Sequence, residues 1–139
     1  MKSFIESLLH IIKSYWITLL TLMFILFLTF FNFKNVQRTE TVVLGDKIVH
    51  LVMYFTLCAV FWYESFKLNI NVNTLRMLFP AIVVPAIFSG AMEYAQSVMT
   101  KYRTGDFDDF VFNVIGVFLA AVFSLLVTRP LMRRFINKR

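Results

Sequence analysis

The sequence predicts an all-α, polytopic membrane protein built as a bundle of four transmembrane helices. Of its 139 residues, 59% are hydrophobic and 16% are charged, whereas soluble domains average about 45–50% apolar and about 25% charged residues. Four segments lack Asp, Glu, Lys and Arg over nearly the length of a membrane span: 15–33, 48–63, 77–92 and 110–128. A spanning helix needs about 20 mainly apolar residues, so this pattern excludes an ordinary soluble domain.

The first expected span covers residues 15–33 and follows a short basic segment. That combination also occurs in signal peptides. However, the apolar run exceeds the h-region length of about 7–15 residues, and no small-x-small cleavage site follows it before Asn35. We therefore expect a retained helix. Residues 1–13 predict a short amphipathic helix along the membrane surface. One face of this helix would be apolar and would contain Phe4, Ile5, Leu8, Leu9 and Ile12.

The other three spans extend the uncharged segments by polar residues at one end. We expect helices over residues 46–65, 77–98 and 109–128. No Gly/Ser or Pro-rich linker and no repeat interrupts the chain, which predicts one domain over residues 1–139. The single cysteine, Cys58, excludes an internal disulfide and the usual cysteine metal clusters.

The basic residues predict the orientation of the bundle. With four spans both termini lie on one side, together with the loop between the second and third helices. That side carries nine of the fourteen Lys and Arg residues, so the positive-inside rule places it in the cytoplasm. The net charge of +6 is explained in the same way, and no nucleic-acid partner is expected. The five basic residues of the other side are Lys34, Arg38, Lys47, Lys101 and Arg103.

Three of the predicted helices carry a polar stripe near their outer ends. Residues spaced by three or four positions share one helical face, and that spacing recurs in each of the three. A charged side chain deep in a bilayer costs about 2.5–3.5 kcal/mol and normally faces the bundle interior or water. We therefore expect these stripes to face one another around a polar pocket that opens outward. Their residues are Asp46, His50, Tyr54, Glu93, Gln96, Asp109 and Asn113.

Three blocks resemble the signature of the VanZ-like membrane proteins: "DKIVHLVMY" (46–54), "MEYAQ" (92–96) and "RTGDFDDFVFNVIG" (103–116). Asp106 and Asp108 lie outside the strict pattern and are expected in a solvated loop. The resemblance implies a small multi-helix protein of the bacterial cytoplasmic (inner) membrane, linked to resistance against the glycopeptide teicoplanin. It implies no defined biochemical activity. The matching positions are Asp46, Lys47, His50, Tyr54, Glu93, Gln96, Arg103, Asp109, Asn113 and Gly116.

The residue types at these positions suit binding of, or chemistry on, an amphiphilic ligand of the cell envelope. An envelope lipid, a lipid-linked cell-wall precursor and a glycopeptide all fit. Arg103 and Lys47 are expected to hold phosphate or carboxylate. His50 and Glu93 are the acid/base candidates, with Asp109 as the third candidate catalytic residue. The expected ligand-binding residues are Asp46, Lys47, Tyr54, Gln96, Arg103 and Asn113.

Three alternatives remain open at the level of sequence. In a structural role, Asn113 and Gln96 only join helices through hydrogen bonds that contribute about 0.6–2 kcal/mol each in membranes. The chain could also act as a small transporter. A metal variant would use His50, Glu93 and Asp109, although no residue is assigned as a metal ligand. No cofactor is identified, and the oligomeric state and the question of catalysis stay open.

Overall fold

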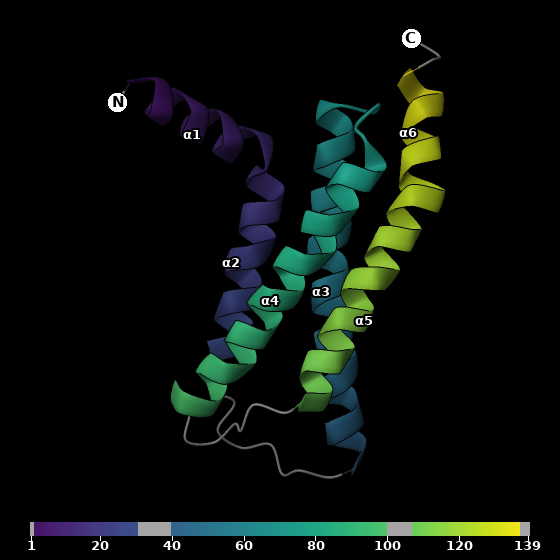
Figure 1. The fold of residues 1–139 in the computed structure, drawn as a ribbon. Coiled ribbons are helices and arrows are strands. Elements are labelled where there is room, and N and C mark those ends of the chain that lie inside the picture. Colours follow the sequence, from purple (N-terminus) through teal and green to yellow (C-terminus); the bar gives the residue numbers. More distant parts are fainter. Residues whose placement is uncertain (1, 31–39, 100–106, 137–139) are drawn as a thin grey trace.

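The computed structural model describes residues 2–30, 40–99 and 107–136, and every element in these ranges is a helix (Figure 1). The all-α prediction is therefore confirmed. The last two helices form one continuous rod through a single π-helical turn at Ser124–Thr128. The helices are α1 (Lys2–Ser14), α2 (Trp16–Phe30), α3 (Glu40–Leu68), α4 (Thr74–Met99), α5 (Phe107–Phe123) and α6 (Arg129–Ile136).

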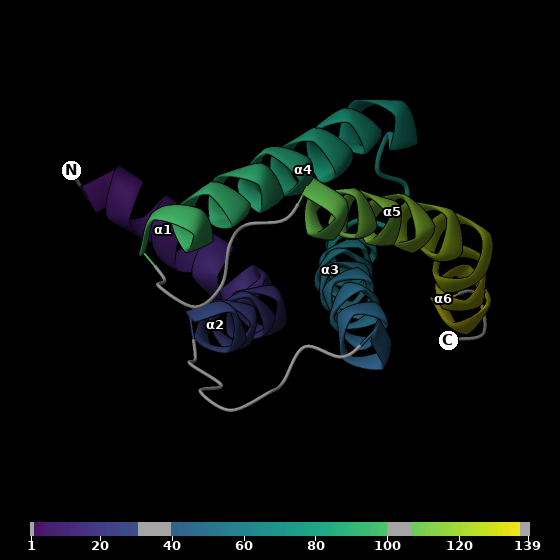
Figure 2. The same cartoon turned by 90° about the horizontal axis from the view of Figure 1, so that it is seen from below.

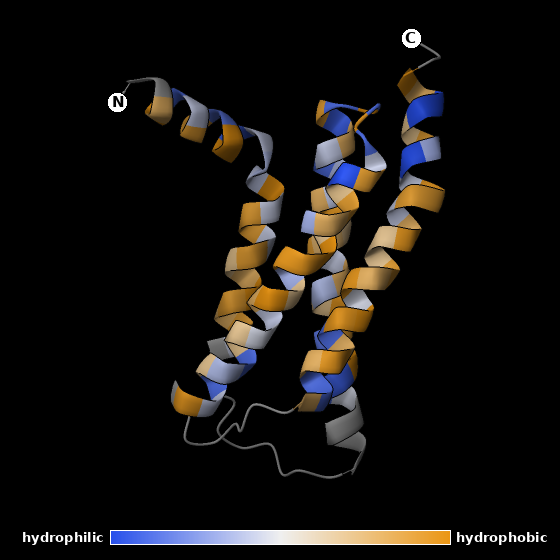
Figure 3. Cartoon of the chain, in the orientation of Figure 1, coloured by the Kyte–Doolittle hydropathy of each residue, from blue (hydrophilic) through white to orange (hydrophobic). Residues whose placement is uncertain are grey.

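Three helical segments are long and apolar enough to cross a membrane. They are Gly45–Leu68, Thr74–Val98 and Phe107–Ile136, with lengths of 24, 25 and 30 residues. A fourth span results if α1 and α2 are counted together, although these two helices are bent by 76° at their junction. The helices are mainly hydrophobic along their length (Figure 3), and many of their large apolar side chains are exposed. The chain is therefore a multi-pass membrane protein.

The predicted spans 46–65, 77–98 and 109–128 lie within these three segments. The third segment runs beyond residue 128 because the π-helical turn continues the rod instead of ending it. The predicted span 15–33 corresponds to α2, whose described part ends at Phe30, and residues 31–33 lie outside the described residues.

Helix α3 forms the centre of the bundle. Seen along the bundle, α2, α4 and α5 surround it (Figure 2). Its most extensive contact is with α5, and buried side chains of the two helices share two core clusters. One cluster contains Tyr54, Cys58, Val117 and Ala120, and the other contains Trp62, Phe66 and Ala121 together with Ala81 of α4.

Gly116 allows the backbones of α3 and α5 to approach closely. A Cβ atom at this position would collide with the Leu51 carbonyl oxygen and lie 3.0 Å from the Phe55 backbone nitrogen. Without a hydrophobic effect between helices in lipid, close packing of small residues is a main source of helix association. The contact at Gly116 therefore fixes how α5 faces α3.

Glu64 of α3 caps the bend between α1 and α2. Its carboxylate accepts hydrogen bonds from the backbone N–H groups of Ile17 (3.1 Å) and Thr18 (3.0 Å) and from the Thr18 hydroxyl (2.7 Å). The first N–H groups of a helix have no partner within it, and negative charge is favoured at that end. The cap explains how a carboxylate that is 2% exposed is accommodated at this end of α3.

Arg129 closes the same end of the bundle from the other side. Its guanidinium donates to the carbonyl oxygens of Ile70 (3.4 Å) and Val72 (3.1 Å) and to the Thr74 hydroxyl. It also lies 5.6 Å from the ring centroid of Phe66. The connection between α3 and α4 is thereby tied to the start of α6.

Gly116→Ala should destabilise the protein, because the added Cβ would push two backbones apart. Overpacking of this kind costs about 1–3 kcal/mol. The temperature of half-maximal aggregation, measured on the detergent-solubilised chain, should fall by several degrees. Gly45→Ala is the control, since a Cβ there would meet no atom within 4 Å. Equal temperatures for the two variants would contradict the assigned role of Gly116.

Glu64→Ala should also lower the thermal stability, because the start of α2 would lose its cap. Loss of a helix cap and of charge-assisted hydrogen bonds costs about 1–3 kcal/mol. Thr18→Val removes only the hydroxyl bond and should have a smaller effect in the same assay. If Thr18→Val destabilises the chain as much as Glu64→Ala does, the Glu64 carboxylate does not cap α2 in the way described.

Candidate functional site

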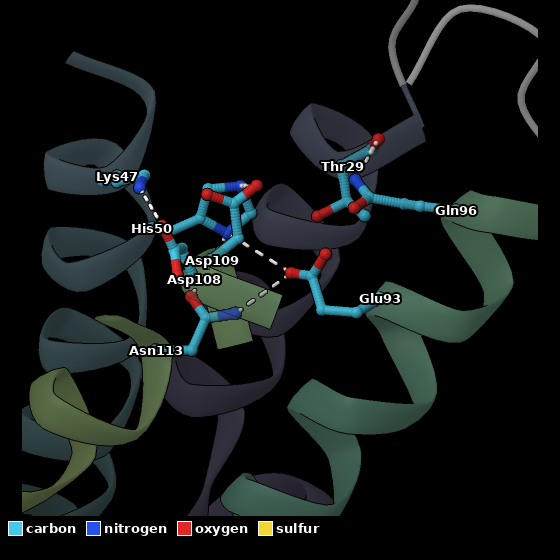
Figure 4. A network of polar contacts seen from close by, with 8 residues as sticks. All are labelled: Thr29, Lys47, His50, Glu93, Gln96, Asp108, Asp109 and Asn113. Atoms are coloured by element: carbon cyan, nitrogen blue, oxygen red, sulfur yellow. Dashed lines mark hydrogen bonds and ion pairs between the residues drawn. The ribbon is translucent and has the colours of Figure 1, made fainter. Parts of the chain in front are cut away.

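Polar side chains of α3, α4 and α5 converge at the lower end of the bundle in Figure 1, where α2 and α4 end and α3 and α5 begin. Figure 4 shows six of these side chains and how they lie toward one another: Lys47, His50, Glu93, Asp108, Asp109 and Asn113. The middle of these helices is mainly apolar, and the hydrophilic residues lie toward their ends (Figure 3). We call this group the polar cluster: Asp46, Lys47, His50, Glu93, Asp108, Asp109 and Asn113.

The helical periodicity of α3 and α5 explains how the polar cluster forms. Asp46 and His50 lie one turn apart on α3, and Asp109 and Asn113 lie one turn apart on α5. Asp109 is in the first turn of α5, where the helix dipole favours a carboxylate. Because Gly116 follows Asn113 by three residues on the same face, the close contact of the helices sets these two stripes against each other.

Asn113 links His50 to Glu93 at the centre of the polar cluster. Its side-chain nitrogen donates to Glu93 Oε1 at 3.2 Å, and its side-chain oxygen lies 3.2 Å from His50 Nδ1. An ionised carboxylate only accepts, so this arrangement makes His50 Nδ1 the donor to Asn113. All three side chains are buried, and Asn113 is only 1% exposed. The network therefore fixes both the tautomer and the orientation of the imidazole.

The other ring nitrogen of His50 is directed at Asp109. The distance between His50 Nε2 and Asp109 Oδ2 is 3.7 Å. Asp46 lies close by as well, since one ligand atom from each of Asp46, His50 and Asp109 lies within 4.8 Å of the others. Asp46 is partly exposed whereas His50 and Asp109 are buried. The polar cluster thus reaches the surface at Asp46.

Lys47 and Asp108 form an ion pair at the edge of the polar cluster. The side chains of Lys47 and Asp108 are 18% and 57% exposed, respectively, and Lys47 Nζ lies 6.0 Å from the ring centroid of Phe112. Asp108 was expected in a solvated loop, but it belongs to the first turn of α5. Exposed ion pairs contribute only about 0–1 kcal/mol, so this pair serves mainly to place a cation at the surface.

The other three predicted site residues are Gln96, Tyr54 and Arg103. Gln96 donates from its side chain to the Thr29 carbonyl oxygen at 3.0 Å, which ties α4 to the last turn of α2. Tyr54 is buried beside Cys58, and its hydroxyl lies close enough to Ser89 and Glu93 to interact with both. Arg103 lies outside the described residues. Thr29 acts through its backbone, and no side-chain pattern in the sequence identifies such an acceptor.

The geometry allows two kinds of chemistry at His50. Its ring lies between two carboxylates, with Glu93 Oε1 3.6 Å from Nδ1 and Asp109 on the side of Nε2. This arrangement suits a group that holds or transfers a proton. The residues that could hold a metal ion are Asp46, His50 and Asp109.

Comparison with known proteins identifies a protein family for this chain. A family model described as VanZ/LLP1 matches residues 5–128. An uncharacterized protein of Schizosaccharomyces pombe is 33% identical over 86 residues, which cover 61% of this chain and 49% of that protein. The chain thus spans about half the length of this relative. No solved structure matches the chain.

Asn113→Ala should destabilise the bundle, because the buried groups of His50 and Glu93 that Asn113 contacts would lose a partner. Such a loss costs about 1–3 kcal/mol. Thermal aggregation of the solubilised protein measures the effect, with the exposed Asn71 replaced by Ala as the matched control. If both alanine variants melt at the same temperature, Asn113 does not hold the polar cluster together.

Proposed function

The chain belongs to the VanZ/LLP1 family, and we propose that its polar cluster binds the anionic head of an amphiphilic cell-envelope ligand. The fatty part of such a ligand would lie along the apolar outer surface of the helices. An envelope lipid or a lipid-linked cell-wall precursor, both of which carry phosphate, has this combination of properties.

The convergence of ionisable side chains in an otherwise apolar bundle is the observation that supports the proposal. One or two amides are enough to join membrane helices by hydrogen bonds. The polar cluster holds four carboxylates, an imidazole and an ammonium group in addition to one amide. Ionisable groups within a membrane protein are costly and commonly mark a functional site.

The exposure of the polar cluster fits access from the membrane surface. Asn113, His50 and Glu93 are buried, whereas Asp46 and Lys47 are partly exposed. Lys47 offers a point charge to phosphate at this edge. Arg103 is proposed as a second, bidentate contact, and His50, Glu93 and Asp109 as the residues that would exchange protons with the ligand.

The location of the site follows from the charges of the chain. The side that holds both termini is richer in Lys and Arg and is proposed to be cytoplasmic. The polar cluster then faces the outer side of a bacterial cytoplasmic membrane. This placement puts the site where cell-wall precursors and glycopeptides are found, which supports a link to teicoplanin resistance.

A purely structural role is the second candidate. The contacts of Asn113 with His50 and Glu93, and of Gln96 with the Thr29 carbonyl, each join two different helices. Transport is less well supported, because transporters place ionisable groups near the midplane and the polar cluster lies at one end of the bundle. The ligand-binding role predicts that removal of a single charge abolishes function. The purely structural role predicts that function is kept.

Asp109→Asn should abolish the protective effect of the protein against teicoplanin, because the site would lose a charge while the side chain keeps its size. A host that lacks the gene is complemented with wild type, Asp109→Asn or Glu6→Gln at matched membrane levels. Glu6 is an exposed carboxylate of α1 and serves as the control. Wild type and Glu6→Gln should raise the inhibitory concentration several-fold over the deletion strain.

Lipid extracts of the purified chains give a second readout. Phosphate-bearing lipids that copurify with wild type should be depleted from Lys47→Gln, which removes the cation, and retained by Glu6→Gln. Equal protection and equal lipid retention by all variants would refute ligand binding at the polar cluster and favour the structural role.

A further inference from the structure

We propose that Asp46, His50 and Asp109 form a binding site for a divalent transition-metal ion, with Zn²⁺ and Mn²⁺ as the ions that suit it best. The proposal rests on the geometry of these three residues and does not require the ligand proposed above. It also differs from the ligand set considered from the sequence, which contained Glu93 in place of Asp46.

The ligand atoms of the three residues are spaced closely enough for one ion to bind them all. Asp46 and His50 lie one turn apart on α3, and Asp109 comes from α5. One atom from each lies within 4.8 Å of the others, and His50 Nε2 is 3.7 Å from Asp109 Oδ2. Two ligands of a tetrahedral zinc ion lie about 3.3 Å apart when each bond is about 2.0–2.1 Å. Small rotations of the side chains therefore bring the three atoms to bonding distance.

The imidazole of His50 is also oriented as a metal ligand would be. Metal-bound histidines almost always donate their other ring N–H to a carbonyl or carboxylate oxygen, which fixes the tautomer. His50 Nδ1 is paired with the Asn113 side-chain oxygen, and Asn113 is in turn oriented by Glu93. This support leaves Nε2 on the side of Asp109, 3.7 Å from its Oδ2 atom. Glu93 then acts as an outer partner and not as a ligand.

The ligand set decides the class of ion. Calcium and magnesium prefer sites made only of oxygen atoms. Imidazole nitrogen suits Zn²⁺, and a site that mixes it with carboxylates also accepts Mn²⁺. Three protein ligands leave at least one coordination position open, as in catalytic zinc sites. The partial exposure of Asp46 provides an entry path for the ion.

A proton on Nε2 is the competing explanation, since a protonated His50 would also be attracted by the two carboxylates. The experiment therefore has to measure the ion itself. Tag-free, full-length protein in detergent is stripped with a chelator and dialysed against Zn²⁺ or Mn²⁺. Elemental analysis then gives the ion bound per chain, and pulsed electron paramagnetic resonance of the Mn²⁺ form reports a nitrogen ligand.

Wild type should bind one ion per chain, with a nitrogen coupling in the Mn²⁺ spectrum. Asp46→Asn and Asp109→Asn should weaken binding at least about tenfold, since even outer partners of a ligand contribute about 10–100-fold in affinity. Glu64→Gln is the matched control. It changes a buried carboxylate on the same helix as Asp46, about 21 Å from His50 at 1.5 Å per residue, and should leave the affinity unchanged. Asp46 is partly exposed, so Asp46→Asn tests the site even if Asp109→Asn impairs folding.

Three results would overturn the proposal. In the first, wild type binds neither ion at millimolar concentration. In the second, binding is the same in wild type, Asp46→Asn and Asp109→Asn. In the third, His10→Asn removes the bound ion while Asp46→Asn does not, which would identify an adventitious ion only, held by the exposed histidine of α1.

Discussion

The close approach of α5 to α3 at Gly116 is the contact on which the arrangement of the site depends. A glycine here removes the side chain that would otherwise collide with the Leu51 carbonyl oxygen. Asp109 and Asn113 precede Gly116 on the same face of α5, so they meet the polar face of α3 only if the backbones stay this close. A packing interaction in the apolar part of the bundle thus determines the geometry of its polar end.

Helix α3 takes part in a group of buried polar contacts near each of its ends, and both groups contain carboxylates. The two groups are built differently. Near its start, His50 and the carboxylates around it interact through side chains of α4 and α5. Near its end, Glu64 is held by backbone N–H groups of α2. Backbone donors fix a carboxylate in one position, whereas side-chain partners can rotate or exchange a proton. This difference explains why only the first arrangement is a plausible centre for chemistry.

The sequence predicted the helices well because hydropathy and helical spacing are local properties. The stripes formed by Asp46 and His50, and by Asp109 and Asn113, followed from the same spacing. The sequence did not reveal the Glu64 cap or the bond from Gln96 to the Thr29 carbonyl, because their partners are backbone groups distant in the chain. It also grouped Glu93 with the possible metal ligands, since spacing alone cannot tell which nitrogen of His50 a carboxylate faces.

The Glu64 cap has a consequence for the biogenesis of the protein. The backbone N–H of Ile17 and the carboxylate that receives it are separated by 47 positions in the chain. During synthesis the first turn of α2 is made before Glu64, and its N–H groups need other partners, such as water or lipid headgroups, until Glu64 reaches them. The bend at the start of α2 can therefore acquire its final form only after α3 has entered the bilayer. Assembly of this corner is a step that follows insertion, and a chain stopped before Glu64 would expose an uncapped helix end at the membrane surface.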